Sequence, residues 1–155
     1  MRGSVEGKRM YGLFEDLYDG EPWLGVNMMS NLRKISASQA AARPLENCNT
    51  IWEITQHMIL WRENVLERLH DKVLMSPEDN YIEKVLDTSS GAWEAVLQEL
   101  KKSQQDWKAY LENVREEELN KVYGPNNQDY YKHIHGILQH DAYHLGQIIL
   151  LLKFV

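Results

Sequence analysis

Apolar residues recur at spacings of three and four along much of the chain, which is the pattern of amphipathic helices. In residues 50–70 this apolar stripe is continuous and comprises Ile51, Ile54, Met58, Trp61, Val65 and Leu69. The segment opens with Thr50 and Glu53, a T-x-x-E capping box in which each side chain can satisfy a free backbone N–H group. The pattern predicts a helix over residues 50–70.

Two later segments show the same periodicity. Residues 89–114 carry their apolar positions at Trp93, Val96, Leu97, Leu100, Trp107, Leu111 and Val114. From residue 129 to the end, the apolar positions form a wide arc, which is typical of a helix buried on much of its circumference. Both segments are predicted to be long helices, and the last one is predicted to be central.

The remaining bundle helix is predicted over residues 22–35, which are rich in apolar side chains, with a short helix before it at residues 11–18. The four prolines lie beside other turn-forming residues, and residues 44–49, 76–80 and 124–127 are predicted to be loops. Sustained period-two alternation, the signal of strands, is nearly absent. The sequence therefore predicts an all-α four-helix bundle that forms a single domain over residues 1–155.

The amino-acid composition limits which partners and which cellular compartment we expect. The 155 residues carry a formal net charge of −6, which argues against a nucleic-acid partner because phosphate binding needs clustered Lys and Arg. The longest apolar run is far shorter than the roughly 20 residues that span a bilayer, so we expect no membrane partner. The single cysteine, Cys48, cannot form an internal disulfide, so a cytoplasmic location is expected. Cys48 is expected to be a buried bystander rather than a reactive thiol.

The chemistry-bearing pattern is a set of three histidines. His140 and His144 are spaced i, i+4, which puts both imidazoles on one side of a helix and close enough to share a metal ion. At about 100° per residue, both point along the apolar stripe of residues 129–155. His57 lies at the border of the stripe of residues 50–70 and can also face inward. Three imidazoles from two helices suit Zn2+, Ni2+ or Fe2+, with coordination positions left for water or substrate.

Other interpretations of these histidines stay open. An H-x-x-x-H spacing often arises by chance, and a histidine on an apolar face is more often hydrogen-bonded in the core than a metal ligand. His133 shares the face of His140 but lies about 10 Å along the helix axis, which makes it a weaker candidate. With Asp141 in place of the glutamate, His140 and His144 also resemble the H-E-x-x-H zinc protease motif superficially, but no third ligand follows downstream.

Three further residues are candidates for contacts around the site. Trp61, one turn after His57, lies where it can line the entrance, although a core position is the simpler interpretation. Gln147 lies within about 60° of His144 and can contact an imidazole or a substrate, or serve as an interhelical amide. Asp141 diverges by about 100° from its neighbour His140, so we expect it to partner another helix.

Three blocks of sequence resemble the DinB/YfiT-like superfamily, whose members are regarded as metalloenzymes. The blocks are residues 18–23 (YDGEPW), residues 49–54 (NTIWEI) leading to His57 and Trp61, and residues 140–148 (HDAYHLGQI). The resemblance implies a four-helix bundle with a long connection between its first and second helices, often a homodimer. It also implies a metal held by His57, His140 and His144.

The function that the resemblance implies has two branches. Some relatives are thiol transferases that use bacillithiol, mycothiol or glutathione, and others are described as metal-dependent hydrolases. We therefore expect a metal-dependent enzyme that acts on a small-molecule substrate, either with a low-molecular-weight thiol cosubstrate or by hydrolysis. The alternative is a non-catalytic bundle whose histidines bind metal for stability or fill the core, and which acts through dimerisation or partner binding.

Overall fold

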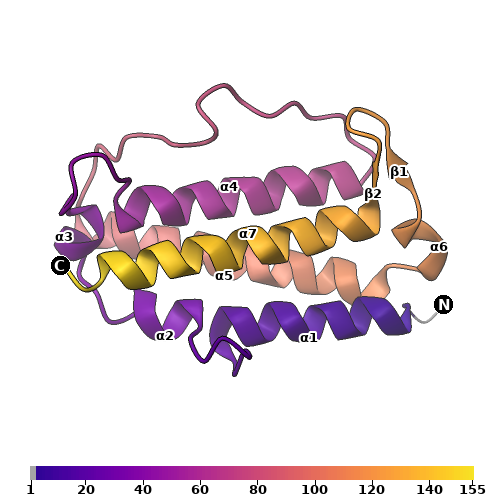
Figure 1. The fold of residues 1–155 in the computed structure, drawn as a ribbon, viewed down its shortest axis with the longest axis horizontal. Coiled ribbons are helices and arrows are strands. Elements are labelled where there is room, and N and C mark those ends of the chain that lie inside the picture. The colour runs from indigo at the N-terminus through magenta and orange to yellow at the C-terminus, as the bar shows by residue number, and fades with distance from the viewer. Residues whose placement is uncertain (1–2) are drawn as a thin grey trace.

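Four long helices run along the longest axis of the computed structural model, which describes residues 3–155 (Figure 1). They are α1 (Val5–Asp19), α4 (Ile51–Leu69), α5 (Ser90–Asn113) and α7 (Tyr130–Leu151). The predicted all-α four-helix bundle is therefore confirmed. The predicted helices over residues 50–70, 89–114 and 129–155 correspond to α4, α5 and α7.

Short elements occupy the connections. Helices α2 (Met28–Leu32) and α3 (Ala37–Ala41) lie between α1 and α4, and α6 (Glu116–Leu119) follows α5. Strand β1 (Val122–Tyr123) pairs antiparallel with β2 (Gln128–Asp129), with Tyr123 opposite Gln128. This hairpin was not predicted, because strands of two residues are too short to show alternation. It encloses the loop that was predicted over residues 124–127.

The helices run in two directions. Helices α4 and α5 point the same way, and α1 and α7 point the opposite way (Figure 1). Residues 20–50 join α1 to α4, which confirms the long first connection that the family resemblance implied. Because α5 is parallel to α4, residues 70–89 must return along the bundle, and they do so beside α4 (Figure 1). This return brings Asn80 against His57 and Trp61 of α4.

The prediction that residues 22–35 form the first bundle helix is wrong. The first bundle helix is α1, whereas Trp23 is 99% exposed in the following loop. The chain turns at residues 20–27, where Gly20 caps α1 and Gly25 adopts a φ of 74°, which favours glycine. The short helix predicted at residues 11–18 is part of α1. The full length of α1 was missed because it buries only a narrow stripe, including Met10 and Phe14, and six of its fifteen residues are charged.

Side-chain caps fix where the two site-bearing helices begin. The predicted capping box of α4 is present: the Glu53 N–H donates to Thr50 Oγ1 at 3.1 Å, and the Thr50 N–H donates to Glu53 Oε2 at 2.8 Å. In α7, the Lys132 N–H donates to Asp129 Oδ1 at 2.7 Å. Each cap satisfies a backbone donor that the first helical turn leaves free.

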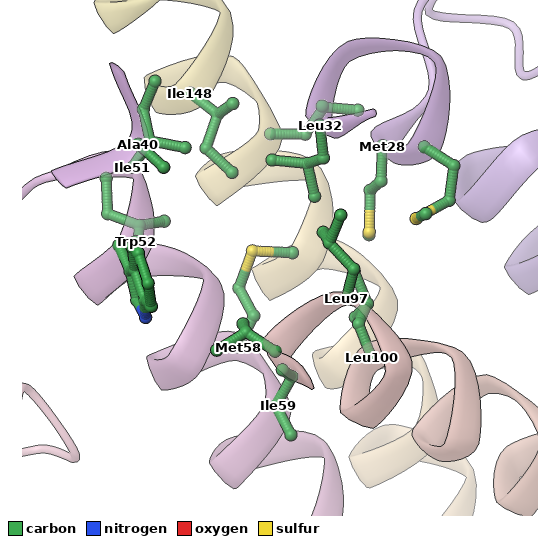
Figure 2. Close-up of a cluster of buried hydrophobic side chains, with 14 of the residues drawn as sticks. Met28, Leu32, Ala40, Ile51, Trp52, Met58, Ile59, Leu97, Leu100 and Ile148 are labelled. Atoms are coloured by element: carbon green, nitrogen blue, oxygen red, sulfur yellow. The ribbon is translucent and has the colours of Figure 1, made fainter. Parts of the chain in front are cut away.

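The interior consists of two apolar clusters. One cluster joins the C-terminal end of α1, the short helices α2 and α3, and the ends of α4, α5 and α7 that lie beside them (Figure 2). The second cluster joins α1 to the opposite ends of α4, α5 and α7. Residues labelled in Figure 2 belong to the first cluster and include Leu32, Trp52, Met58, Leu100 and Ile148.

A buried polar chain lies between the two clusters and links all four long helices. Arg62 Nε of α4 lies 3.0 Å from Asp141 Oδ2 of α7, and both side chains are 1% exposed. Arg62 Nη2 donates to Gln104 Oε1 of α5 at 2.6 Å, and Gln104 Nε2 donates to Glu15 Oε1 of α1 at 2.6 Å. Asp141 therefore partners another helix, as its helical phase indicated.

Two expectations about exposure can be compared with the structure. Cys48 is exposed, so the expectation that it is buried is wrong. It lies in the surface loop before α4, where backbone polar groups need access to water. Within residues 3–155, no helix is both long enough and apolar enough to cross a membrane.

The assignment of α1 as the first bundle helix can be tested by truncating one aromatic side chain inside it and one outside it. Phe14 of α1 is 1% exposed and stacks on Trp107 at 4.9 Å between ring centroids. Phe14→Ala should lower the free energy of unfolding by about 3–5 kcal/mol, because it leaves a cavity in the core. The control Trp23→Ala should change it by less than about 0.5 kcal/mol. Urea denaturation measures both, and the opposite ranking would restore the helix predicted at residues 22–35.

Candidate metal centre

Three imidazole nitrogens lie close together between α4 and α7. His57 Nε2 lies 3.0 Å from His140 Nε2 and 3.0 Å from His144 Nε2, and the last two atoms are 3.1 Å apart. The three atoms form a nearly equilateral triangle. Among the described residues, this is the group of His, Cys, Asp and Glu side chains whose ligand atoms converge closely enough to hold a metal ion.

The opposite nitrogen of two of these rings is held by an oxygen acceptor. His57 Nδ1 lies 2.7 Å from the backbone oxygen of Asn80, and His144 Nδ1 lies 2.7 Å from Gln147 Oε1. Gln147 Nε2 donates to the Tyr143 hydroxyl at 3.0 Å, which is consistent with this orientation of the amide. Because a carbonyl oxygen only accepts, Nδ1 of each ring carries the proton.

These tautomers leave lone pairs that face each other. With Nδ1 protonated, the Nε2 atoms of neutral His57 and His144 both carry a lone pair, and they are 3.0 Å apart. His140 can donate an Nε2–H to only one of them. The triangle therefore cannot be satisfied by hydrogen bonds among the three rings, whereas a bound cation would satisfy one lone pair from each ring.

The donor set fits a divalent metal ion. Imidazole nitrogen is a common ligand of Zn2+, Ni2+ and Fe2+, and zinc binds it at about 2.0–2.1 Å. The three nitrogens lie close enough together for one ion to contact all of them. Three ligands are fewer than the four that close a structural zinc site, so coordination positions would remain open.

His140 has a different environment from the other two. Its Nδ1 lacks a hydrogen-bond partner within residues 3–155 and lies 3.8 Å from Asp141 Oδ1. Asp141 points into the bundle toward Arg62, so it neighbours His140 without contacting the open side of the triangle. At 3.8 Å this contact is too long for a hydrogen bond, so the Asp141 carboxylate interacts with the His140 ring through its charge alone.

The triangle opens into a surface pocket of about 530 Å³. Trp61 and Gln147 line this pocket, as do Tyr143 and Asn80. The Trp61 indole N–H donates to Asn80 Oδ1 at 3.0 Å, and the Trp61 ring centroid lies 6.3 Å from that of His140. Trp61 thus forms a wall of the pocket beside the three histidines.

His133 lies in the same pocket but outside the triangle. Its Nδ1 is 2.9 Å from the Asp129 backbone oxygen, and its Nε2 is 3.2 Å from Asn126 Nδ2. Both ring nitrogens are therefore engaged, which leaves no free lone pair for a metal. The helical distance from His140 predicted this separation.

Asn80 lies in the segment of residues 70–89 that returns along α4, and it accepts hydrogen bonds from His57 and Trp61. The periodicity of the sequence did not identify this residue. Asn80 and Tyr81 have φ values of 53° and 57°, and asparagine tolerates this left-handed region better than most residues. An asparagine in a loop signals such a turn, but it does not reveal which helix the turn contacts.

Burial favours the neutral form of His57 and of His144. Removal from water lowers the pKa of His57, and the interaction with His140 lowers it further against the opposing effect of the Asn80 hydrogen bond. Burial likewise lowers the pKa of His144 to about 4. Metal binding requires neutral imidazole, so the environment favours the form that can act as a ligand.

The fold and the site define a four-helix-bundle protein with three inward-facing histidines that are open to a surface pocket. The family model described as the DinB superfamily matches residues 26–148, which is most of the chain. The chain therefore belongs to the DinB superfamily. No curated protein and no solved structure matches it.

The lowered pKa of His144 predicts a pH dependence of the metal-free protein. An unfolded histidine binds a proton near its ordinary pKa of 6.5, whereas folded His144 does so near 4. Between these values the unfolded state binds more protons, so the free energy of unfolding should fall as the pH is lowered from about 6.5 to 4.

Denaturation of metal-free protein across this pH range measures the effect. His144→Asn should show a shallower dependence than the wild type, and His135→Asn, which lies outside the triangle, serves as the control. Equal slopes for wild type and His144→Asn would contradict the prediction.

Proposed function

We propose that the protein binds one divalent metal ion through Nε2 of His57, His140 and His144 and acts as a metal-dependent enzyme on a small molecule. The observation that carries the proposal is the triangle of 3.0–3.1 Å between these nitrogens, two of which are oriented as acceptors by Asn80 and Gln147. Outer contacts of this kind fix ligand rings in many metal sites. Imidazole ligands suit Zn2+, Ni2+ and Fe2+.

The open side of the triangle supports catalysis rather than a structural metal. Structural zinc sites are usually closed by four protein ligands, whereas catalytic sites keep a position for water or substrate. Here three histidines supply one face, and the pocket of about 530 Å³ lies beside it. That volume is within the range of small-molecule sites.

Between the two branches of the family, the pocket favours thiol transfer over carboxylate-assisted hydrolysis. Among the described residues that line the pocket, none is Asp or Glu. Asp141, which occupies the position of the general base in the protease motif, is 1% exposed and paired with Arg62. Hydrolysis that relies on a carboxylate base has no candidate there, whereas thiol transfer needs only a thiolate and an electrophile.

A bound divalent ion would supply the charge that holds a thiol as its thiolate, with the thiol proton released to solvent. In thiol transfer the sulfur would form a bond to the electrophilic carbon of the second substrate. The leaving group would depart with its electron pair and take up a proton from solvent, which balances the proton released by the thiol. Asn80 and Gln147 keep the imidazoles oriented throughout. Trp61 and Tyr143 flank the pocket and limit how the two substrates approach.

The proposed metal site predicts how the amount of bound metal per chain changes when its histidines are substituted. Protein purified without added metal should contain about one divalent ion per chain by elemental analysis. His57→Ala and His140→Ala should both lose most of it, because each removes one of three ligands. His133→Ala is the matched control, since it removes a histidine of the same pocket whose nitrogens are engaged elsewhere. Full occupancy in both ligand variants would refute the site and leave the alternative of a non-catalytic bundle.

The thiol branch can be tested by spectroscopy on Co2+-substituted protein. A thiol that binds the metal as thiolate should produce a saturable charge-transfer band, and the corresponding alcohol should not. Circular dichroism confirms that the substituted protein is folded. Absence of the band with bacillithiol, mycothiol and glutathione, while Co2+ remains bound, would exclude thiol transfer with these cosubstrates and favour hydrolysis.

A further inference from the structure

Arg68 is a buried cation without an ionic partner. Its side chain is 7% exposed, and its Nε is buried without a hydrogen bond. Within residues 3–155, no carboxylate lies within 4.0 Å of its guanidinium. Yet Arg68 lines the same pocket as the three histidines. Buried charges are normally paired, because an isolated charge loses its hydration without compensation.

Two aromatic rings hold the Arg68 guanidinium in place. Its Cζ atom lies 5.6 Å from the centroid of the Trp61 ring and 5.2 Å from that of Tyr123. Tyr123 is itself fixed, because its hydroxyl donates to the Leu74 oxygen at 2.9 Å and accepts from the Leu74 N–H at 2.8 Å. Such contacts orient a guanidinium while its N–H donors remain available to an anion.

A second arginine on the same helix shows what a purely structural arginine looks like in this protein. Arg62 is 1% exposed, lies 3.0 Å from Asp141 and donates to Gln104. Its charge is therefore compensated within the bundle. The cation–π contacts of Arg68 supply no negative charge, so they do not replace such a partner.

The charge of the pocket is opposite to that of the whole protein. The chain carries 23 acidic residues and a formal net charge of −6. Among the described residues that line the pocket, however, Arg68 and Lys132 are permanently charged and none is Asp or Glu. Lys132 is exposed and has no ion pair within residues 3–155. A pocket lined in this way attracts anions.

The Arg68 guanidinium and the three histidines are close enough for one small molecule to contact both. Arg68 Cζ is 5.6 Å from the Trp61 ring centroid, which is 6.3 Å from the His140 ring centroid, so Cζ lies within about 12 Å of His140. His57 and Arg68 are eleven residues apart on α4, which corresponds to nearly the same face. A small molecule can therefore span both points.

We propose that Arg68, with Lys132, forms an anion-binding subsite that holds a carboxylate or phosphate group of the small molecule whose reactive end lies at the three histidines. The planar guanidinium can pair with two oxygens of such a group. The anion supplies the negative charge that the protein does not give Arg68. This inference rests on the proposed function for the reactive end, but the anion subsite itself requires no metal.

The subsite can be tested first on metal-free protein with inorganic phosphate as the probe. In a two-dimensional 1H–15N spectrum, the Arg68 Nε–H and Trp61 indole N–H signals should shift saturably with phosphate, and not with chloride at equal ionic strength. Followed on the Trp61 signal, Arg68→Gln should weaken phosphate binding roughly tenfold or more, because it removes charge-assisted hydrogen bonds.

Matched variants keep this test independent of folding defects. Lys132→Gln alters an exposed residue and should weaken phosphate binding severalfold. Lys101→Gln removes the same charge from an exposed position on α5 outside the pocket and should leave binding unchanged. An absence of saturable shifts in the wild type, or equal affinity in the wild type, Lys132→Gln and a folded Arg68→Gln, would overturn the proposal.

A second measurement separates the subsite from the metal proposal. On Co2+-substituted protein, ω-mercaptocarboxylates of increasing chain length are compared with the matching ω-mercaptoalcohols. At the best length the carboxylate should bind roughly tenfold tighter, and Arg68→Gln should abolish that preference while Co2+ stoichiometry stays unchanged. Phosphate binding without Co2+ binding would refute the metal site alone. Co2+ binding without phosphate binding or a carboxylate preference would refute the anion subsite alone.

Discussion

The ion pair between Arg62 and Asp141 constrains the geometry of the whole bundle. Both side chains are 1% exposed, so neither charge can be compensated by water. Breaking such a buried pair by removing one partner costs about 3–5 kcal/mol. Any sliding of α4 along α7 would separate the two charges. Because Arg62 follows His57 by five residues and Asp141 adjoins His140, the same pair sets the register at which the three histidines meet.

The buried polar chain that contains this pair forms a polar layer across the bundle. On either side, the apolar clusters supply burial and helix packing. Within the layer, Gln104 and Glu15 extend the network to α5 and α1. On the open side of α4 and α7, the layer meets the pocket that carries the histidine triangle. Partial burial at this boundary lowers the pKa of His57 and of His144, while the pocket leaves the three imidazoles open to a substrate.

Helical periodicity predicted α4, α5 and α7 because each has a continuous apolar stripe, and the Thr50 and Glu53 pair marked where α4 begins. It identified only residues 11–18 of α1, whose buried stripe is narrow, and assigned the bundle position to residues 22–35, whose apolar side chains include the exposed Trp23. Apolar content alone does not reveal which segment finds a partner. Glycine turns and packing against α5 decided that α1 fills this position.

The sequence by itself determined which helix faces carry His57, His140 and His144, because helical phase is a local property of the backbone. Only the tertiary structure decided that their Nε2 atoms meet, that Asn80 orients His57, and that Arg68 is buried without a carboxylate. These features depend on the path of the 70–89 return segment and on the register between distant helices. Long-range packing sets both, and spacing along the chain does not encode them.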